Sequence, residues 1–567
     1  MDNRDFPGMC RTIVDEILSW DPSYSTQLGW RKYDHLMMDP SMEARDHRVE
    51  RLSEFMRMVG KFKDAELEPD HIIDRDLAMY MFRLREFEIS RLRIPEQMSI
   101  AEDEIGRSLF FLFVRDDQPF DVRARALISR LEKTPAFLEA ARRTLVRPYR
   151  MWTELALTTG KELPSLLELI KSVAAMKLTS DEVMMRLSGA TADAQDAIVA
   201  YERWLFEEVL PEAHDENTIT AEDFEEYMQL KEFGVTADEA LEVGDIGLKM
   251  ADKQRLKVAK ELSPSGKPSD AIRKMKEDHP PTFEGALKSY REWIESARDF
   301  VISNGLATIP NGEKLLVIET PQFMRRQMPF AAQYEPGKYS GCMTGLFLVT
   351  PHDSNLQLLM EHNHASIANT SVHEGYPGHH LQGICSNQNP SDIRTISASP
   401  CFGEGWALYC ENMMFEKGFQ NSQLGKLAQL NDLVFRIVRV RADVGLARKT
   451  MTPEEVAALL VKETGMDEGA ALDDAKSYTY GMTYYMSYFI GMLEMLRLRE
   501  EVESALGERF DLREFHDSLL YAGCLPMHFM RRVEALRLKR DYGVDLPDSK
   551  ETLLEFIRRR SSEGMEF

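Results

Sequence analysis

The run Val372-His373-Glu374-Gly375-Tyr376-Pro377-Gly378-His379-His380 places three imidazoles and one carboxylate within eight residues, from 373 to 380. This density of ligand-type side chains indicates a metal site, because a His-Glu pair followed by another His is the core of zinc hydrolase motifs. In such motifs two imidazoles bind the ion and the Glu activates its water. The run therefore predicts His373 as a metal ligand and Glu374 as a general base.

The spacing of the histidines differs from the usual one, in which two His lie four residues apart on one helix face. From His373 the gap is six residues to His379 and seven to His380. A straight helix would move these rings about 9 Å and about 10.5 Å along its axis. Pro377 removes a helical hydrogen bond and Gly378 tolerates unusual dihedral angles. These residues predict a bulged metal helix, with His379 or His380 as the second ligand.

A third ligand is expected in the next distinctive run, Phe402-Gly403-Glu404-Gly405-Trp406-Ala407-Leu408-Tyr409-Cys410-Glu411. Glu404 leads a stretch with helical spacing. Two His, one Glu and a water form a familiar catalytic zinc set. The predicted set is one zinc ion per chain bound by His373, His379 and Glu404. A plain capping box at Ser371 and Glu374 is the structural alternative, but it explains neither the later histidines nor Glu404.

At these residues the chain resembles the domain of unknown function 885 family, whose signature is a His-Glu-Gly-Tyr-Pro-Gly-His-His run followed by Glu-Gly-Trp. The first run is matched in full at residues 373–380. Arg436, Arg439 and Asp443 match the family's Arg/Arg/Asp-Val-Gly pattern, and Phe515-His516-Asp517 matches its late Phe-His-Asp motif. The N-terminal half matches only loosely. The family pattern differs at Met482-Thr483-Tyr484-Tyr485, so substrate preferences are not carried over.

A more distant similarity is to zinc peptidases of the thimet oligopeptidase and angiotensin-converting enzyme type. Their ligand Glu falls about a helix and a turn after the second His, and the interval here, 404 − 379 = 25, favours His379 over His380. His380 is then an outer partner or an alternative ligand. Those peptidases also carry a Tyr-rich helix that holds the tetrahedral intermediate, which implies a catalytic role for Tyr485 and Tyr488.

Two of these assignments have structural alternatives. Aromatic residues at helical spacing often pack in a core, because each buries a large apolar area. Arg436 and Arg439 lie three residues apart, and such a pair can grip a substrate carboxylate with parallel hydrogen bonds. The same arginines can instead tie their helix to an acidic neighbour such as Asp443.

Composition limits the partners and the compartment. With a net charge of −24 over 567 residues, nucleic acid is not an expected partner, because its phosphates would be repelled. The six Cys residues show no Cys-x-x-Cys pair, which is typical of reduced thiols in the cytoplasm. The first thirty residues are charged and lack an apolar run with a cleavage site, so we expect no signal peptide. The apolar stretch from Gly481 to Leu496 is too short to cross a membrane. We expect a peptide substrate and no membrane partner, and a homodimer stays open.

The predicted fold is mainly α, with two lobes. Apolar residues recur at helical spacing in residues 164–175, 284–303 and 453–464. Residues 314–319 and 345–350 are β-rich and predict a small sheet beside the metal helix. The Pro-rich stretch from Leu262 to Phe283 marks a lobe boundary. We therefore expect an N-terminal helical lobe over residues 1–280 and a zincin-like catalytic lobe over residues 281–567.

The sequence thus predicts a metallopeptidase, a hydrolase in which Glu374 and a metal-activated water cleave amide bonds in short peptides. A metal-dependent deacylase of small N-acyl compounds would use the same ligands. A non-catalytic peptide-binding protein is the other alternative, since the altered residues 482–485 lie in the expected tyrosine cluster.

Overall fold

The computed structural model describes residues 5–115, 117–322, 325, 330–351 and 359–567, and most of them are helical. The helices begin where capping residues predict. For example, Thr452 and Glu455 form a reciprocal capping box at the start of α22 (Pro453–Thr464), and Gly465 ends it in the left-handed conformation. The predicted helices at 164–175, 284–303 and 453–464 are confirmed as α9, α15 and α22.

The N-terminal half contains α1 (Phe6–Trp20), α2 (Pro22–Leu28), α3 (Met42–Val59), α4 (Pro69–Phe87), α5 (Ile94–Gln97), α6 (Ala101–Val114), α7 (Phe120–Thr144), α8 (Arg150–Gly160), α9 (Leu163–Lys177), α10 (Asp181–Trp204), α11 (Leu210–Glu212), α12 (Ala221–Leu230), α13 (Ala237–Leu262), α14 (Pro268–Glu277) and α15 (Phe283–Ser303). The C-terminal half contains α17 (His364–Glu374), α18 (His379–Ser386), α19 (Asp392–Thr395), α20 (Pro400–Glu416), α21 (Gln423–Ala447), α22, α23 (Glu468–Tyr478), α24 (Tyr484–Leu506), α25 (Leu512–Leu520), α26 (Met527–Tyr542) and α27 (Leu553–Ser562).

A small sheet lies between α15 and α17 in the chain. Its strands are β1 (Lys314–Glu319), β2 (Ala331–Tyr334) and β3 (Thr344–Val349), in the order β1-β3-β2. The central strand β3 pairs with β1 in parallel and with β2 in antiparallel. Two of these strands match the predicted β-rich runs, whereas β2 was not predicted because it is only four residues long.

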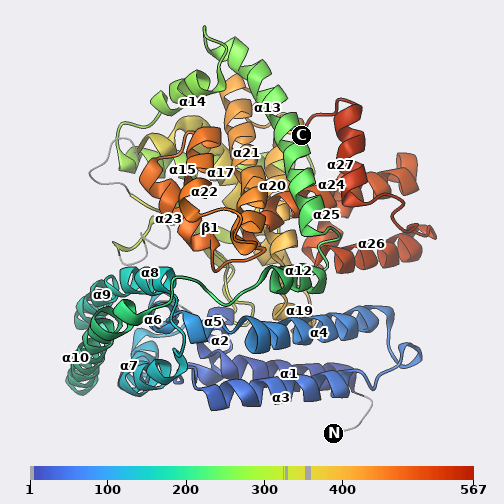
Figure 1. Cartoon of the computed structure of the whole chain (residues 1–567). Coiled ribbons are helices and arrows are strands. Elements are labelled where there is room, and N and C mark those ends of the chain that lie inside the picture. The colour runs from blue at the N-terminus through green and yellow to red at the C-terminus, as the bar shows by residue number, and fades with distance from the viewer. Residues whose placement is uncertain (1–4, 116, 323–324, 326–329, 352–358) are drawn as a thin grey trace.

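The N-terminal helices α1–α4 and α6–α10 lie along one side of the molecule, and the C-terminal helices lie along the other (Figure 1). Helices α6–α10 surround a hydrophobic core of their own, which includes Leu131, Leu166 and Ile198. The larger core joins α1–α4 to the C-terminal helices. An ion pair between the buried Arg394 and Asp74, at 2.6 Å, adds a polar link between these two parts. The predicted division at residue 280 stays a prediction.

Helices α20 and α24 approach each other very closely. A Cβ on Gly491 would lie 1.9 Å from the carbonyl oxygen of Cys401, and one on Gly405 would lie 2.5 Å from Gly491. Only glycine fits at such a contact, since any side chain would separate the two backbones. The contact places the first two turns of α20 against the third turn of α24. The predicted burial of the apolar stretch 481–496 is confirmed, because most of the residues in this part of α24 are buried.

No helix in the described part of the chain combines the length and the apolar character needed to cross a membrane.

Candidate metal centre

Two consecutive helices carry the histidines of the motif. Helix α17 ends at Glu374 and α18 begins at His379, so a tight turn between two helices takes the place of the predicted gapped, bulged helix. Gly378 is required in this turn, because a Cβ there would lie 1.9 Å from the carbonyl oxygen of His373. The turn folds the chain back on itself. The imidazole rings of His373 and His379 therefore lie with their centres 4.8 Å apart, nearly perpendicular to each other.

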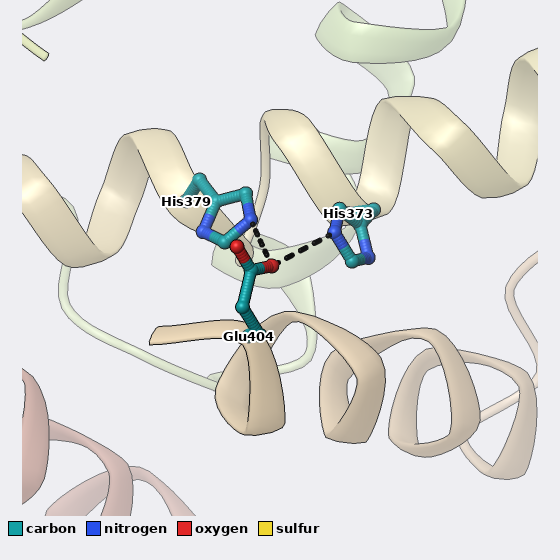
Figure 2. Close-up of side chains that lie close together, drawn as sticks. All are labelled: His373, His379 and Glu404. Atoms are coloured by element: carbon teal, nitrogen blue, oxygen red, sulfur yellow. Dashed lines mark hydrogen bonds and ion pairs between the residues drawn. The ribbon is translucent and has the colours of Figure 1, made fainter. Parts of the chain in front are cut away.

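Glu404, the fifth residue of α20, completes a three-residue cluster (Figure 2). Its Oε2 lies 3.1 Å from Nε2 of His379 and 3.7 Å from Nε2 of His373. One ligand atom from each of the three residues lies within 4.8 Å of the others. The structure therefore brings together the three side chains that the sequence predicts as ligands.

The outer nitrogen of His373 is held by a second carboxylate. Nδ1 of His373 lies 2.7 Å from Oε1 of Glu411, and the other oxygen of Glu411 accepts a hydrogen bond from Asn369 at 2.7 Å. Since a carboxylate accepts hydrogen bonds, Nδ1 carries the proton and Nε2 presents its lone pair to the cluster when the ring is neutral. Glu411 follows Glu404 by two helical turns on the same face of α20. The sequence shows the spacing of Glu404 and Glu411 but does not reveal that Glu411 contacts His373.

The cluster has the electrostatics of a cation site. Burial lowers the pKa of His373, but hydrogen bonds with Glu404 and Glu411 outweigh it and raise this pKa to about 10. Burial would raise the pKa of Glu404, yet His379 and His373 hold it well below the ordinary value. Glu374 adds a negative charge that acts on both imidazoles. The buried carboxylates therefore favour positive charge at the imidazoles.

His380 points away from the cluster. Its Nε2 lies 2.9 Å from Glu313, a fully buried carboxylate that also accepts hydrogen bonds from Tyr376 and, at 2.8 Å, from Arg298. Consecutive residues of a helix differ in direction by about 100°, so His379 and His380 cannot both face Glu404. His379 therefore belongs to the cluster. His380 lies outside the cluster, where its contact with Glu313 helps to hold the turn.

The tyrosines of the cluster at 478–488 separate into two groups. Tyr484, the first residue of α24, donates a hydrogen bond to Glu404, and its hydroxyl lies 3.4 Å from that of Tyr488. The ring of Tyr488 is nearly parallel to that of His373, with 6.4 Å between centres. The hydroxyl of Tyr485 instead lies 3.0 Å from that of Ser477. The structure places Tyr488 beside the cluster and Tyr485 away from it. Tyr484, which sequence reasoning did not select, lies four residues before Tyr488.

The two arginines of the family pattern differ in their contacts. Arg439 donates to the hydroxyl of Tyr478 at 2.8 Å and lies 3.5 Å from Asp474. Arg436 lies 3.7 Å from Asp432 and 5.8 Å from the ring centre of Tyr488, and its Nε has no hydrogen-bond partner among the described residues. Arg439 therefore supports α23, which carries Tyr478 and Asp474. Of the two arginines, Arg436 is the one that lies beside Asp432.

The protein is thus a mainly helical protein with a candidate metal centre, to which α17, α18 and α20 contribute two histidines and a glutamate. The chain belongs to the DUF885 family, described as bacterial proteins of unknown function, whose model matches residues 22–533. This confirms the resemblance seen in the motifs. No curated protein matches the chain significantly.

Solved structures show the same fold. A candidate lipoprotein of unknown function from Shewanella oneidensis has a TM-score of 0.77 at 22% identity, covering 94% of this chain and 99% of its own. A candidate lipoprotein from Colwellia psychrerythraea has a TM-score of 0.82 at 19% identity, covering 95% and 99%. A carboxypeptidase from Pyrococcus furiosus has a TM-score of 0.31 at 12% identity, covering 92% and 98%, a likeness too weak to support any inference.

Substituting Glu411 by Gln is expected to weaken zinc binding about 10- to 100-fold, the usual effect of losing the outer partner of a ligating His. Glutamine keeps the shape of the side chain but removes the charge that orients His373 Nδ1. Competition with a zinc-chelating dye measures the affinity. Glu416→Gln, on the same helix and paired at the surface with Arg499, is the matched control. Equal affinities for both variants would contradict a role for Glu411.

Proposed function

We propose that this protein is a zinc-dependent peptidase that cleaves amide bonds, mainly in short peptides. The observation that carries the proposal is the cluster of His373, His379 and Glu404 beside Glu374. Two imidazoles and a carboxylate are a recurrent ligand set of catalytic zinc, and a carboxylate directly after the first His is the usual general base.

The two distances from the Glu404 oxygen to the imidazole nitrogens agree with a tetrahedral ion. Ligands about 2.1 Å from tetrahedral zinc lie about 3.4 Å from one another. The distances of 3.1 Å and 3.7 Å from Glu404 to the two Nε2 atoms are close to this value. Glu411 orients one imidazole from outside, as the outer partners of metal-ligating histidines do. His373, His379 and Glu404 would therefore hold one zinc ion per chain.

The surrounding residues supply the remaining chemistry. Bound by His373, His379 and Glu404, a zinc ion would supply the Lewis acidity that polarises the scissile carbonyl and acidifies a water. Glu374 takes the proton of that water on its carboxylate and delivers it to the leaving amine. The hydroxyl of Tyr488 donates a hydrogen bond to the developing oxyanion, a role typically worth about 10²–10³ in rate. The Tyr485 hydroxyl is bonded to Ser477, away from the cluster, and Tyr484 donates its hydrogen to Glu404. We therefore assign the oxyanion to Tyr488 and give Tyr484 the role of holding Glu404 in place.

The proposal includes the zincin-like, two-lobed arrangement. The three ligands, Glu374, Glu411 and both tyrosines all belong to residues 281–567, the proposed catalytic lobe. Residues 1–280 would form the lobe that restricts access and so favours short peptides over folded proteins.

All six cysteines are free, which supports a reducing compartment and hence the cytoplasm.

The test is the metal content and activity of protein purified without chelators. We expect about one zinc per chain by elemental mass spectrometry, and cleavage within a library of dipeptides and oligopeptides. Release of acyl groups from N-acyl amino acids without any peptide cleavage would show a deacylase instead. Tight binding of peptides without turnover would show a binding protein.

A further inference from the structure

A cavity of about 450 Å³ lies between the N-terminal helices and the segment leading into α24. Its wall includes Arg48 of α3, Glu88 at the end of α4, Lys231 just after α12, and Tyr484. The hydroxyl of Tyr484 reaches the Glu404 carboxylate of the metal cluster. The cavity and the cluster are therefore separated by the length of one tyrosine side chain, which is close enough to act on the same bound molecule.

The charge of this cavity is opposite to that of the chain. The net charge of the protein is −24, yet the side chains that line the cavity include more cations than anions, namely Arg45, Arg48, Arg93 and Lys231 against Glu88 and Glu96. Glu96 is occupied by its ion pairs with Arg45 and Arg93. Arg48 and Lys231 are the cations that remain for a ligand.

Neither of these two cations has an ion-pair partner within the described residues. Arg48 donates to the carbonyl oxygen of Asp39 at 2.6 Å, and burial lowers its pKa. The amino group of Lys231 donates to the hydroxyl of Thr483 at 2.8 Å and lies 4.4 Å from the ring centre of Tyr227. Burial also lowers the pKa of Lys231. Both cations are partly buried, and the carboxylates that act on them, Asp39 for Arg48 and Glu88 for Lys231, form no ion pair with them. An anion bound between the two groups would therefore be stabilised by charge-assisted hydrogen bonds.

The backbone beside Lys231 is strained. Thr483 has a φ of +65°, a region that β-branched residues rarely adopt. Its N–H donates to the buried Asp443 at 2.9 Å, and its hydroxyl accepts the bond from Lys231. Such strain persists where surrounding contacts enforce it, and it concentrates at ligand sites. Thr483 directly precedes Tyr484, so the contact with Lys231 couples the cavity to the tyrosine of the metal centre.

We propose that this cavity binds a carboxylate group of the substrate through Arg48 and Lys231, so that the enzyme selects peptides with a negative charge near the scissile bond. The inference rests on the proposed peptidase function, because it assigns the substrate class of that same centre. The carboxylate belongs either to the peptide C-terminus or to an acidic side chain, and both present the same group to the two cations.

The test measures peptide binding to the zinc-loaded Glu374→Gln protein by calorimetry. Three peptides separate the sources: tetra-alanine as the free acid, tetra-alanine amide, and an alanine tetrapeptide amide with one glutamate. We expect at least one charged peptide to bind more than tenfold tighter than tetra-alanine amide. Preference for the free acid identifies the C-terminus, and preference for the glutamate peptide identifies a side chain.

Adding Arg48→Gln or Lys231→Met to this protein should weaken binding of the preferred peptide about 10- to 100-fold, the effect of losing a hydrogen bond to a charged group. Binding of tetra-alanine amide should not change. Arg48→Lys should restore part of the affinity, which separates a charge effect from misfolding. Arg186→Gln, which removes a surface arginine paired with Glu132, is the control expected to change nothing.

Equal affinity for the charged and neutral peptides, or a loss confined to Arg436→Gln, would overturn the assignment of this cavity. The proposed function is tested separately by the unmodified enzyme. If that enzyme binds charged peptides through Arg48 and Lys231 but cleaves none of them, the peptidase proposal fails and the carboxylate site stands.

Discussion

Replacing His373 or Glu404 with alanine is expected to abolish stoichiometric zinc binding and all hydrolytic activity. Each substitution leaves two of the three protein ligands, whereas catalytic zinc sites use three plus a water. The remaining carboxylates would also lose the partner that holds them in place, since Glu404 lies within 4 Å of both imidazoles. Elemental mass spectrometry of the purified variants, beside the unmodified protein, gives the zinc content directly.

Two controls make this measurement specific. His364→Ala removes an exposed histidine at the other end of α17, and Glu416→Ala removes a carboxylate from the far end of α20. Both should retain about one zinc per chain. Retention of zinc in His373→Ala and Glu404→Ala, with an unchanged zinc affinity, would show that the metal lies elsewhere.

The sequence motif was sufficient to predict that His373, His379 and Glu404 lie together, because their residue types and intervals are typical of metal-binding motifs; their role as ligands stays a prediction. It could not choose between His379 and His380 from local geometry, since that choice depends on the turn at Gly378. The same limit applies to Tyr484 and Tyr485, which are adjacent in sequence and differ by about 100° around the helix. The close packing of α20 against α24 at Gly405 and Gly491 decides which tyrosine reaches Glu404.

Partners from distant parts of the chain carried no local signal. Glu313, which binds His380, lies just before β1 and 67 residues upstream. Strand β2 is too short to show a pattern.

By contrast, the ends of α15 and α22 agree with the predicted limits to within one residue, because strong periodicity and capping residues define them locally. Within the stretch predicted as a lobe boundary, α14 forms an amphipathic helix that buries Ala271, Ile272 and Met275.

Glu374→Gln is expected to lower kcat by about 10²–10⁴, the usual contribution of a general base, while about one zinc per chain is retained. Glutamine has the shape of glutamate but cannot accept the proton. The other nearby carboxylates are occupied: Glu404 by both imidazoles, Glu411 by His373 and Asn369, and Asp432 by Asn369. Glu374 forms no hydrogen bond to any residue of the described ranges, so its carboxylate is available to a water.

A general base needs a carboxylate that is free to bind a water, whereas a structural carboxylate is already bonded to other side chains. A carboxylate of the second kind on a nearby residue is therefore the control. Glu361 lies just before the same helix and is paired with Lys276, so Glu361→Gln removes an equivalent charge from an occupied position. We expect that variant to keep both zinc and turnover. Single-turnover hydrolysis of a peptide from the library, with zinc content measured on the same samples, compares the two. A Glu374→Gln protein with full zinc and full activity would show that another group takes the proton and that turnover does not need the charge of Glu374.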